Sequence, residues 1–206
     1  MAPVNLASFF CDPSGRVFFQ NGFVFRSIDT SYQIEYDLLI GSGLHVDLVD
    51  LGLIINHEDS EIDNSFNPIP YKVIKPEQIP FISYPYEWSF TQLKDAALLT
   101  LAIQKKALQF GMELKDASAF NIQFHNLMPI LIDTLSFQIY RDGQPWGAYG
   151  QFCRHFLAPR NPTITPSFAI GASRYGLTKQ CVKTIGAGPA NWSTNSTSIF
   201  RRLQMQ

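Results

Sequence analysis

The last quarter of this 206-residue chain contains no acidic residue. All 17 aspartates and glutamates lie before residue 160, together with 10 of the 16 lysines and arginines. The other 6 basic residues lie in residues 160–206, so a first part of charge −7 precedes a second of charge +6. We therefore expect one domain at residues 1–159, followed by a basic, Ser/Thr-rich and weakly ordered tail at residues 160–206.

Cysteines and charged residues are also scarce. The three cysteines Cys11, Cys153 and Cys181 form no CxxC pair, which argues against a disulfide scaffold and against a zinc ribbon. Charged residues make up 16% of the chain and the net charge is −1, so nucleic acid is not an expected partner. The chain lacks an apolar run of about 20 residues and a basic-then-apolar start, so we expect no membrane partner and a cytoplasmic location.

Hydrophobic residues make up 46% of the chain, enough for one globular core. Asn21-Gly22 between the apolar runs 16–19 and 23–26 predicts a β-hairpin, because both residues tolerate a positive φ. Residues 31–53 have apolar spacing typical of helix, interrupted near residues 41–43 and ending in a turn at Gly52.

The middle of the chain carries clear local signals. Ser89 and Gln92 have the capping-box spacing and Gly111 is a stop signal, which together predict a long helix. Residues 112–121 are expected to be mostly loop, followed by a strand-turn-strand unit that turns at His125-Asn126. The predicted fold class is α+β. Short strands are expected at residues 53–55, 71–74 and 80–84, with helix as the alternative for 53–55, and a surface loop is expected at residues 56–70.

One group of polar residues is the strongest candidate for chemistry in this sequence. Asn121 follows Asp116 by five residues, and Asp133 follows Asn121 by twelve, directly after the apolar run 130–132. An aspartate aimed at a substrate hydroxyl accepts its proton, while an amide oxygen and a second carboxylate are ligands that Mg²⁺ prefers. Asp116 is therefore the candidate catalytic base, and Asn121 and Asp133 are candidate magnesium ligands. Turn formation and a structural salt bridge are the alternatives.

This order of residues resembles the catalytic segment of protein kinases and small-molecule phosphotransferases, where Asp-x4-Asn precedes a strand that ends in a metal-binding Asp. The resemblance implies a reduced protein-kinase-like two-lobe domain, with a front lobe at about residues 12–84 and a helical lobe at about 85–159. It also implies ATP with Mg²⁺ as the cofactor and nucleotide-binding roles for Arg26, Glu35 and Glu87. A surface ion pair for Arg26 with Glu35, and an aromatic cluster around Glu87, are the alternatives.

Several features depart from the kinase pattern. Arg26 stands in place of the phosphate-gripping lysine. A planar guanidinium is not equivalent to the compact ammonium of lysine. LKD at residues 114–116 stands in place of His-Arg-Asp, and Thr-Leu rather than Phe-Gly follows Asp133. The sequence shows no glycine-rich phosphate loop. These departures leave the grip on the phosphates as the weakest part of the kinase hypothesis.

Four longer sequence segments resemble the N-terminal region of bacterial proteins classed as class I SAM-dependent methyltransferases, nodulation-type members included. They are PFISYPYEWSFTQLKDAALLTL at residues 80–101, LKDASAFNIQF at 114–124, IDTLSF at 132–137 and QFCRHFLAP at 151–159. The resemblance covers about residues 12–159 and implies that a methyltransferase domain follows this region in the family. The short run IGAG at residues 185–188 lacks the preceding strand and acidic residue of a cofactor loop, so SAM is expected only with that downstream domain.

Three hypotheses for function follow. The first is the N-terminal accessory module of a truncated methyltransferase-type protein, partnered by a methyltransferase domain or protein and unable to transfer methyl groups alone. The second is a Mg-ATP-dependent phosphotransferase that uses Asp116, Asn121 and Asp133. The third is a non-functional gene remnant.

Overall fold

The computed structural model describes residues 4–5, 13–61 and 68–157. The expected tail at residues 160–206, with its IGAG run, lies outside the described residues. The described part is a mixed α/β structure with antiparallel sheets, as the α+β prediction states. Of the helices in these ranges, none combines the length and the apolar character that crossing a membrane requires.

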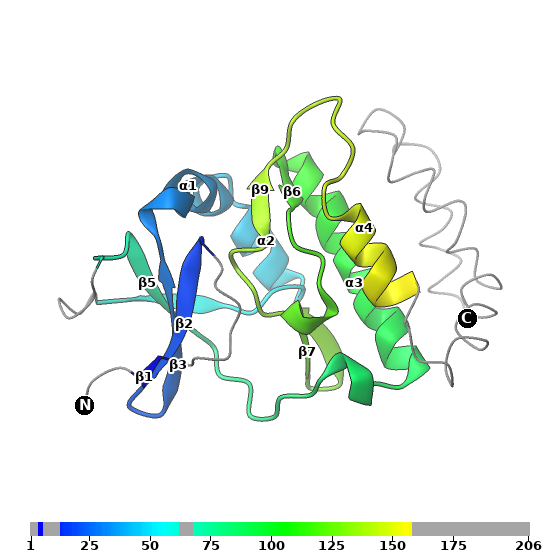
Figure 1. The fold of residues 1–206 in the computed structure, drawn as a ribbon, viewed down its shortest axis with the longest axis horizontal. Coiled ribbons are helices and arrows are strands. Elements are labelled where there is room, and N and C mark those ends of the chain that lie inside the picture. Colours follow the sequence, from blue (N-terminus) through cyan, green and yellow to red (C-terminus); the bar gives the residue numbers. More distant parts are fainter. Residues whose placement is uncertain (1–3, 6–12, 62–67, 158–206) are drawn as a thin grey trace.

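Five strands form an antiparallel sheet in the order β1-β2-β3-β5-β4 (Figure 1). The β2–β3 hairpin turns at Asn21 and Gly22, whose φ values of 52° and 84° are both positive, so the hairpin prediction is confirmed. The strands are β1 (Val4–Asn5), β2 (Gly15–Gln20), β3 (Phe23–Ile28), β4 (His57–Ser60) and β5 (Lys72–Pro76).

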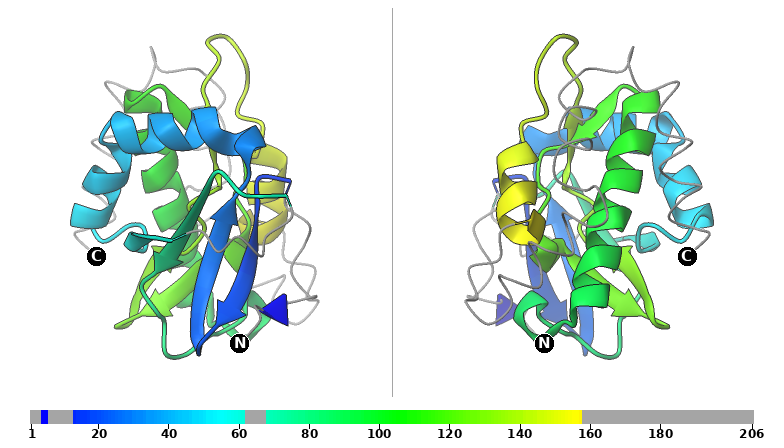
Figure 2. Two further views of the ribbon diagram at one scale, coloured as in Figure 1. Left: turned by 90° about the vertical axis from the view of Figure 1, so that its left-hand side faces the viewer. Right: turned by 90° about the vertical axis from the view of Figure 1, so that its right-hand side faces the viewer.

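Two short helices, α1 (Gln33–Gly41) and α2 (Leu44–Asp50), follow β3 and lie near one end of the strands of the sheet (Figure 2). The break between them is at Gly43, which has a φ of 85°, and α2 is followed by Gly52 with a φ of 67°. Both positions favour glycine because side chains with a Cβ rarely adopt this conformation. The predicted interruption and turn are therefore confirmed.

The long helix α3 (Phe90–Gln109) begins and ends at the predicted signals. The Ser89 hydroxyl accepts a hydrogen bond from the Gln92 backbone N–H at 3.3 Å, and the Gln92 side chain accepts one from the Ser89 N–H at 2.9 Å. Gly111, with a φ of 72°, ends the helical segment. This reciprocal pair satisfies two backbone donors that the first helical turn leaves without partners.

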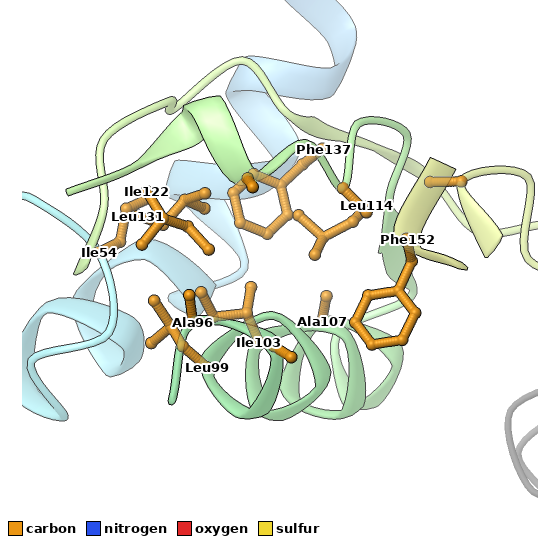
Figure 3. Close-up of a cluster of buried hydrophobic side chains, with 14 of the residues drawn as sticks. Ile54, Ala96, Leu99, Ile103, Ala107, Leu114, Ile122, Leu131, Phe137 and Phe152 are labelled. Carbon is orange, nitrogen blue, oxygen red and sulfur yellow. The ribbon is translucent and has the colours of Figure 1, made fainter. Parts of the chain in front are cut away.

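Two further strand pairs pack against α3. β6 (Met112–Leu114) pairs with β9 (Phe137–Ile139), and β7 (Ile122–His125) forms a hairpin with β8 (Met128–Leu131). After β9 come α4 (Tyr149–Phe152) and a π-helical turn at Cys153–Leu157. Figure 3 shows the main core, where one face of α3 meets side chains from the strands: Ala96, Leu99, Ile103 and Ala107 opposite Leu114, Ile122, Leu131 and Phe137.

Three local predictions are wrong. Residues 57–60, expected in a surface loop, form β4, because they pair with β5. The polar sequence of residues 57–60 gives no sign of this hydrogen bonding. Residues 80–84 are not a strand, and the Ser83 backbone instead bonds the side chain of Gln123. Residues 53–55 form only a single bridge, between Ile54 and Leu131, rather than a strand.

A pair of histidines, one buried (His45) and one half-buried (His57), joins α2 to β4. The ring centroids of His45 and His57 lie 4.4 Å apart, and His57 Nε2 lies 3.0 Å from the Tyr36 hydroxyl on α1. His45 Nε2 and His57 Nδ1 are buried without a hydrogen-bond partner. Burial lowers the pKa of both imidazoles, that of His57 to about 4, and their proximity adds to the effect at His57.

This pair predicts a loss of stability on acidification. Between the ordinary histidine pKa of about 6.5 and about 4, the unfolded chain binds protons that the folded chain excludes, so stability falls as the pH falls through this window. We expect His45→Gln and His57→Gln to flatten this part of a plot of unfolding free energy against pH, measured by urea unfolding. His125→Gln, a change at a more exposed histidine, serves as the control. Equal slopes in all four proteins would show that the histidine pair is not the cause.

Candidate functional site

Asp133 lies in the turn between β8 and β9 and is 9% exposed. Its Oδ1 accepts a hydrogen bond from the backbone N–H of Leu135 at 3.0 Å, and its Oδ2 accepts one from the Ser136 hydroxyl at 2.7 Å. Aspartate commonly closes turns in this way, by accepting from a backbone N–H two residues on. These contacts hold the carboxylate in one orientation.

Ser136 connects Asp133 to Asn121. The Asn121 Nδ2 donates to the Ser136 Oγ at 3.1 Å, and the single hydroxyl hydrogen of Ser136 is used on the carboxylate. The Asn121 backbone carbonyl also accepts from the N–H of Ile132 at 2.8 Å. Since Ser136 is fully buried, the two candidate magnesium ligands are brought together on one hydroxyl that solvent does not reach.

Arg26 reaches the same carboxylate from the five-stranded sheet. Its Nη1 lies 2.5 Å from the Asp133 Oδ1, and the two side chains are only 13% and 12% exposed. Arg26 lies on β3, beside β5, so this ion pair links the sheet to the turn before β9. A pair this buried depends on mutual compensation, because each charge has lost most of its contact with water.

Tyr32 lies beside this ion pair, just before α1. Its hydroxyl donates to the Phe137 carbonyl at 2.6 Å, and the Lys115 ammonium lies 4.3 Å from its ring centroid. Burial raises the pKa of Tyr32, the charges of Asp133 and Glu35 raise it further, and the charge of Arg26 opposes them. Of the residues predicted from the sequence, Arg26 and Asp133 are in direct contact, whereas Glu35 affects the pKa of Tyr32 only through its charge.

Asp116 lies at the start of the loop that leads to Asn121. Its Oδ1 accepts from the Ser118 N–H at 2.8 Å, and its own N–H donates to the Ser136 carbonyl at 3.4 Å. The backbone of Asp116 thus meets the same residue that joins Asn121 to Asp133, while its side chain closes a turn. The Asp116 side chain is partly buried. Its role as the catalytic base stays a prediction.

Glu87 lies away from these contacts, in the short 3-10 turn Pro85–Glu87 before α3. Its carboxylate accepts from the Tyr84 N–H at 2.7 Å and so closes that turn. Nearby, the Trp88 indole donates to the Ser83 hydroxyl at 2.9 Å and packs edge-on against Phe124. The structure thus places Glu87 in a locally capped turn beside an aromatic cluster, and its contact with a nucleotide stays a prediction.

The donor set suits a cation that is shared with a ligand. In the described ranges no three His, Cys, Asp or Glu side chains are grouped to hold a metal. Magnesium is commonly bound by one or two protein oxygens, with water and substrate phosphates as its other ligands. Asp133 and Asn121 would supply one carboxylate and one amide oxygen to a site of that type, and the Asn121 side chain meets Ser136 through its amide nitrogen.

Three residues of the site were missed by the sequence reasoning: Ser136, Tyr32 and Lys115. Ser136 follows Asp133 by three residues, directly after the turn that the Asp133 side chain closes, so a local signal was available in the turn-forming aspartate. Lys115 donates to the Ser14 hydroxyl at 2.6 Å and faces Tyr32, contacts that join residues 101 and 83 positions apart. Such long-range contacts leave no pattern in a single sequence.

The chain is similar to a curated bacterial protein, the nodulation protein NoeA of Rhizobium meliloti (strain 1021). The two are 39% identical over 159 residues, which is 76% of this chain and 33% of NoeA. The chain thus spans about a third of the length of the curated relative it matches. No protein-family model matches the chain.

The Arg26–Asp133 pair predicts a large cost for removing either charge. Arg26→Gln and Asp133→Asn should each lower the unfolding free energy by about 3–5 kcal/mol, because each leaves a buried charge without compensation. The double variant should lose less than the two single losses combined. Urea unfolding of the four proteins measures this coupling.

The Lys72–Asp59 pair offers a matched control at a similar distance, 2.7 Å, with side chains 35% and 63% exposed. There Lys72→Gln and Asp59→Asn should each cost about 1 kcal/mol or less, because solvent screens the pair. Equal losses at the two pairs would show that burial does not set the strength of the Arg26–Asp133 contact.

Proposed function

We propose that residues 1–159 form a kinase-like nucleotide-binding module of a longer protein of the NoeA type, and that a magnesium–nucleotide complex binds at Asn121 and Asp133. The observation that carries the proposal is the cluster around Ser136, which brings these two side chains together. The resemblance to SAM-dependent methyltransferase proteins adds that methyl transfer belongs to the remainder of the longer protein. By this proposal the module is accessory and does not transfer methyl groups alone.

The order of elements supports the kinase-like part of the proposal. The long helix α3 leads into β6, then into the loop with Asp116 and Asn121, the β7–β8 hairpin and Asp133, after which β9 returns to pair with β6. The antiparallel sheet that carries Arg26 lies beside this segment, on the side away from α3 (Figure 1). In the kinase arrangement this order places the metal ligands opposite a phosphate-gripping cation.

The charges of the site also suit this role. Arg26 is planar, permanently charged and already directed at Asp133, and a guanidinium pairs well with phosphate as well as with carboxylate. Mg²⁺ held by Asp133 and Asn121 would neutralise part of the phosphate charge. Binding then requires Arg26 to share its hydrogen bonds between the carboxylate and the nucleotide.

Binding of magnesium and ATP should stabilise the protein. At a ligand concentration of about 100 times Kd the expected gain is about 2.7 kcal/mol, or an increase of about 5–10 °C in Tm for a domain of this size. Asp133→Asn should abolish this shift, because it removes the charged magnesium ligand. Asp50→Asn makes the same chemical change at an exposed position and should retain it. Scanning calorimetry with and without Mg-ATP measures the effect, and an absent shift in the wild-type protein contradicts the proposal.

A phosphotransferase is the second candidate, favoured by the contact between the Asp116 N–H and the Ser136 carbonyl, because Ser136 also contacts Asn121 and Asp133. Asp116→Asn keeps an oxygen that accepts from Ser118 but removes the base. Any release of the γ-phosphate should fall by about 10²–10⁴-fold, while the Mg-ATP thermal shift remains. Binding without turnover in the wild-type protein rejects this candidate and leaves the accessory module.

A further inference from the structure

The loop that carries Asp116 and Asn121 is held by Trp146, which precedes α4, and by side chains of the helical segment at residues 149–157. The Trp146 indole donates to the Leu114 carbonyl at 2.7 Å, at the end of β6. The Gln151 Oε1 accepts from the Ala117 N–H at 2.8 Å, and the His155 Nδ1 accepts from the Ala119 N–H at 3.1 Å. The loop is thus attached at successive points before it reaches Asn121.

This helical segment is itself firmly packed. Phe152 and Phe156 are 2% and 1% exposed and belong to the main core, with ring centroids 5.1 Å apart. Phe152 also packs on Trp146, at 5.7 Å between centroids. Gln151 and His155 each lie one residue before one of these aromatic residues, so the core fixes the position of both acceptors.

The His155 contact determines which nitrogen carries the proton. A backbone N–H can only donate, so the Nδ1 that faces Ala119 must be an unprotonated acceptor. The Ser118 hydroxyl lies 3.3 Å from the same nitrogen and accepts in turn from the Phe120 N–H at 3.2 Å. The imidazole is therefore neutral, with its proton on Nε2. A doubly protonated ring loses the contact with Ala119, because Nδ1 then becomes a donor facing a donor.

We propose that Gln151 and His155 are positioning residues for the loop of Asp116 and Asn121, and that His155 holds the loop only in its neutral form. Protonation of His155 releases the loop at Ala119, while Gln151 keeps its hold on Ala117 because an amide does not titrate in this range. The placement of Asn121 thereby depends on pH. The consequence for nucleotide binding rests on the proposed function, whereas the release of the loop does not.

The surroundings of His155 allow this change within an accessible pH range. Burial lowers the pKa of the imidazole, Asp116 opposes this shift, and Arg154 adds to it. The Phe120 ring packs edge-on at 6.1 Å between centroids and carries no charge. The neutral form therefore predominates at pH 7.5, and the protonated form is reached below the ordinary histidine pKa of about 6.5.

Amide hydrogen exchange of the full chain, measured by NMR at Ala117 and Ala119, tests the proposal. Between pH 7.5 and 5, the protection factor of Ala119 should fall by about 2- to 10-fold, the range for losing one hydrogen bond. That of Ala117 should not show this additional loss and serves as the control within the same loop, because a general loss of stability on acidification affects both amides alike. His155→Asn, which replaces Nδ1 with an amide oxygen, should keep Ala119 protected at both pH values, and His155→Ala should leave it unprotected at both.

Unchanged Ala119 protection in the wild-type protein across this range, or in His155→Ala, overturns the proposal. Gln151→Leu should deprotect Ala117 alone. Calorimetric binding of Mg-ATP to the wild-type protein and to His155→Asn separates this inference from the proposed function. A decrease in affinity at pH 5 in the wild type but not in His155→Asn supports both. Failure of the wild type to bind at pH 7.5 contradicts the nucleotide site only, because the exchange result stands without it.

Discussion

The ion pair between Arg26 and Asp133 is the contact on which the arrangement of this protein depends. It joins the five-stranded sheet to the segment between β8 and β9. That segment and the start of β9 contribute to both hydrophobic clusters: Leu135 packs with Ile28 and Ile74, while Phe137, in β9, packs in the main core. A polar contact between two apolar clusters fixes their relative position more narrowly than side-chain packing does, since an ion pair with a fixed hydrogen-bond geometry tolerates little displacement. The same carboxylate therefore has a structural role and is the best candidate for chemistry.

The elements predicted correctly from the sequence are those with local energetic causes. Asn21-Gly22 and Gly43 mark backbone conformations that few other residues adopt, and Ser89 with Gln92 satisfies the first turn of a helix within four residues. The wrong predictions concern segments whose hydrogen-bond partners lie far away in the chain. The strand His57–Ser60 has no apolar alternation and exists because β5 is beside it, whereas residues 80–84 look extended and apolar but give their backbone groups to the side chain of Gln123.

The candidate site divides in the same way. The spacing of Asp116, Asn121 and Asp133 was visible in the sequence, and the structure joins all three through Ser136, although the side chain of Asp116 closes a turn. The ion pair that the structure gives Arg26 was not predicted, because the expected partner was Glu35 and the observed one lies 107 positions later. Likewise, His155 and Gln151 had no recognisable motif: their role follows from which nitrogen or oxygen meets a backbone N–H, and only the folded chain determines that.

The network around Asp133 also constrains how a ligand can enter. Both carboxylate oxygens already accept hydrogen bonds, and Arg26 supplies the compensating charge. An incoming cation would therefore displace part of the Arg26–Asp133 interaction, because the Asp133 carboxylate is already paired. An anionic phosphate would then give the Arg26 guanidinium a replacement partner. Neither ligand alone restores the balance: a cation without phosphate adds a like charge beside Arg26, and a phosphate without a cation adds a like charge beside Asp133. By the function proposed above, a metal–nucleotide complex would bring both charges together and would match the site better than either component alone.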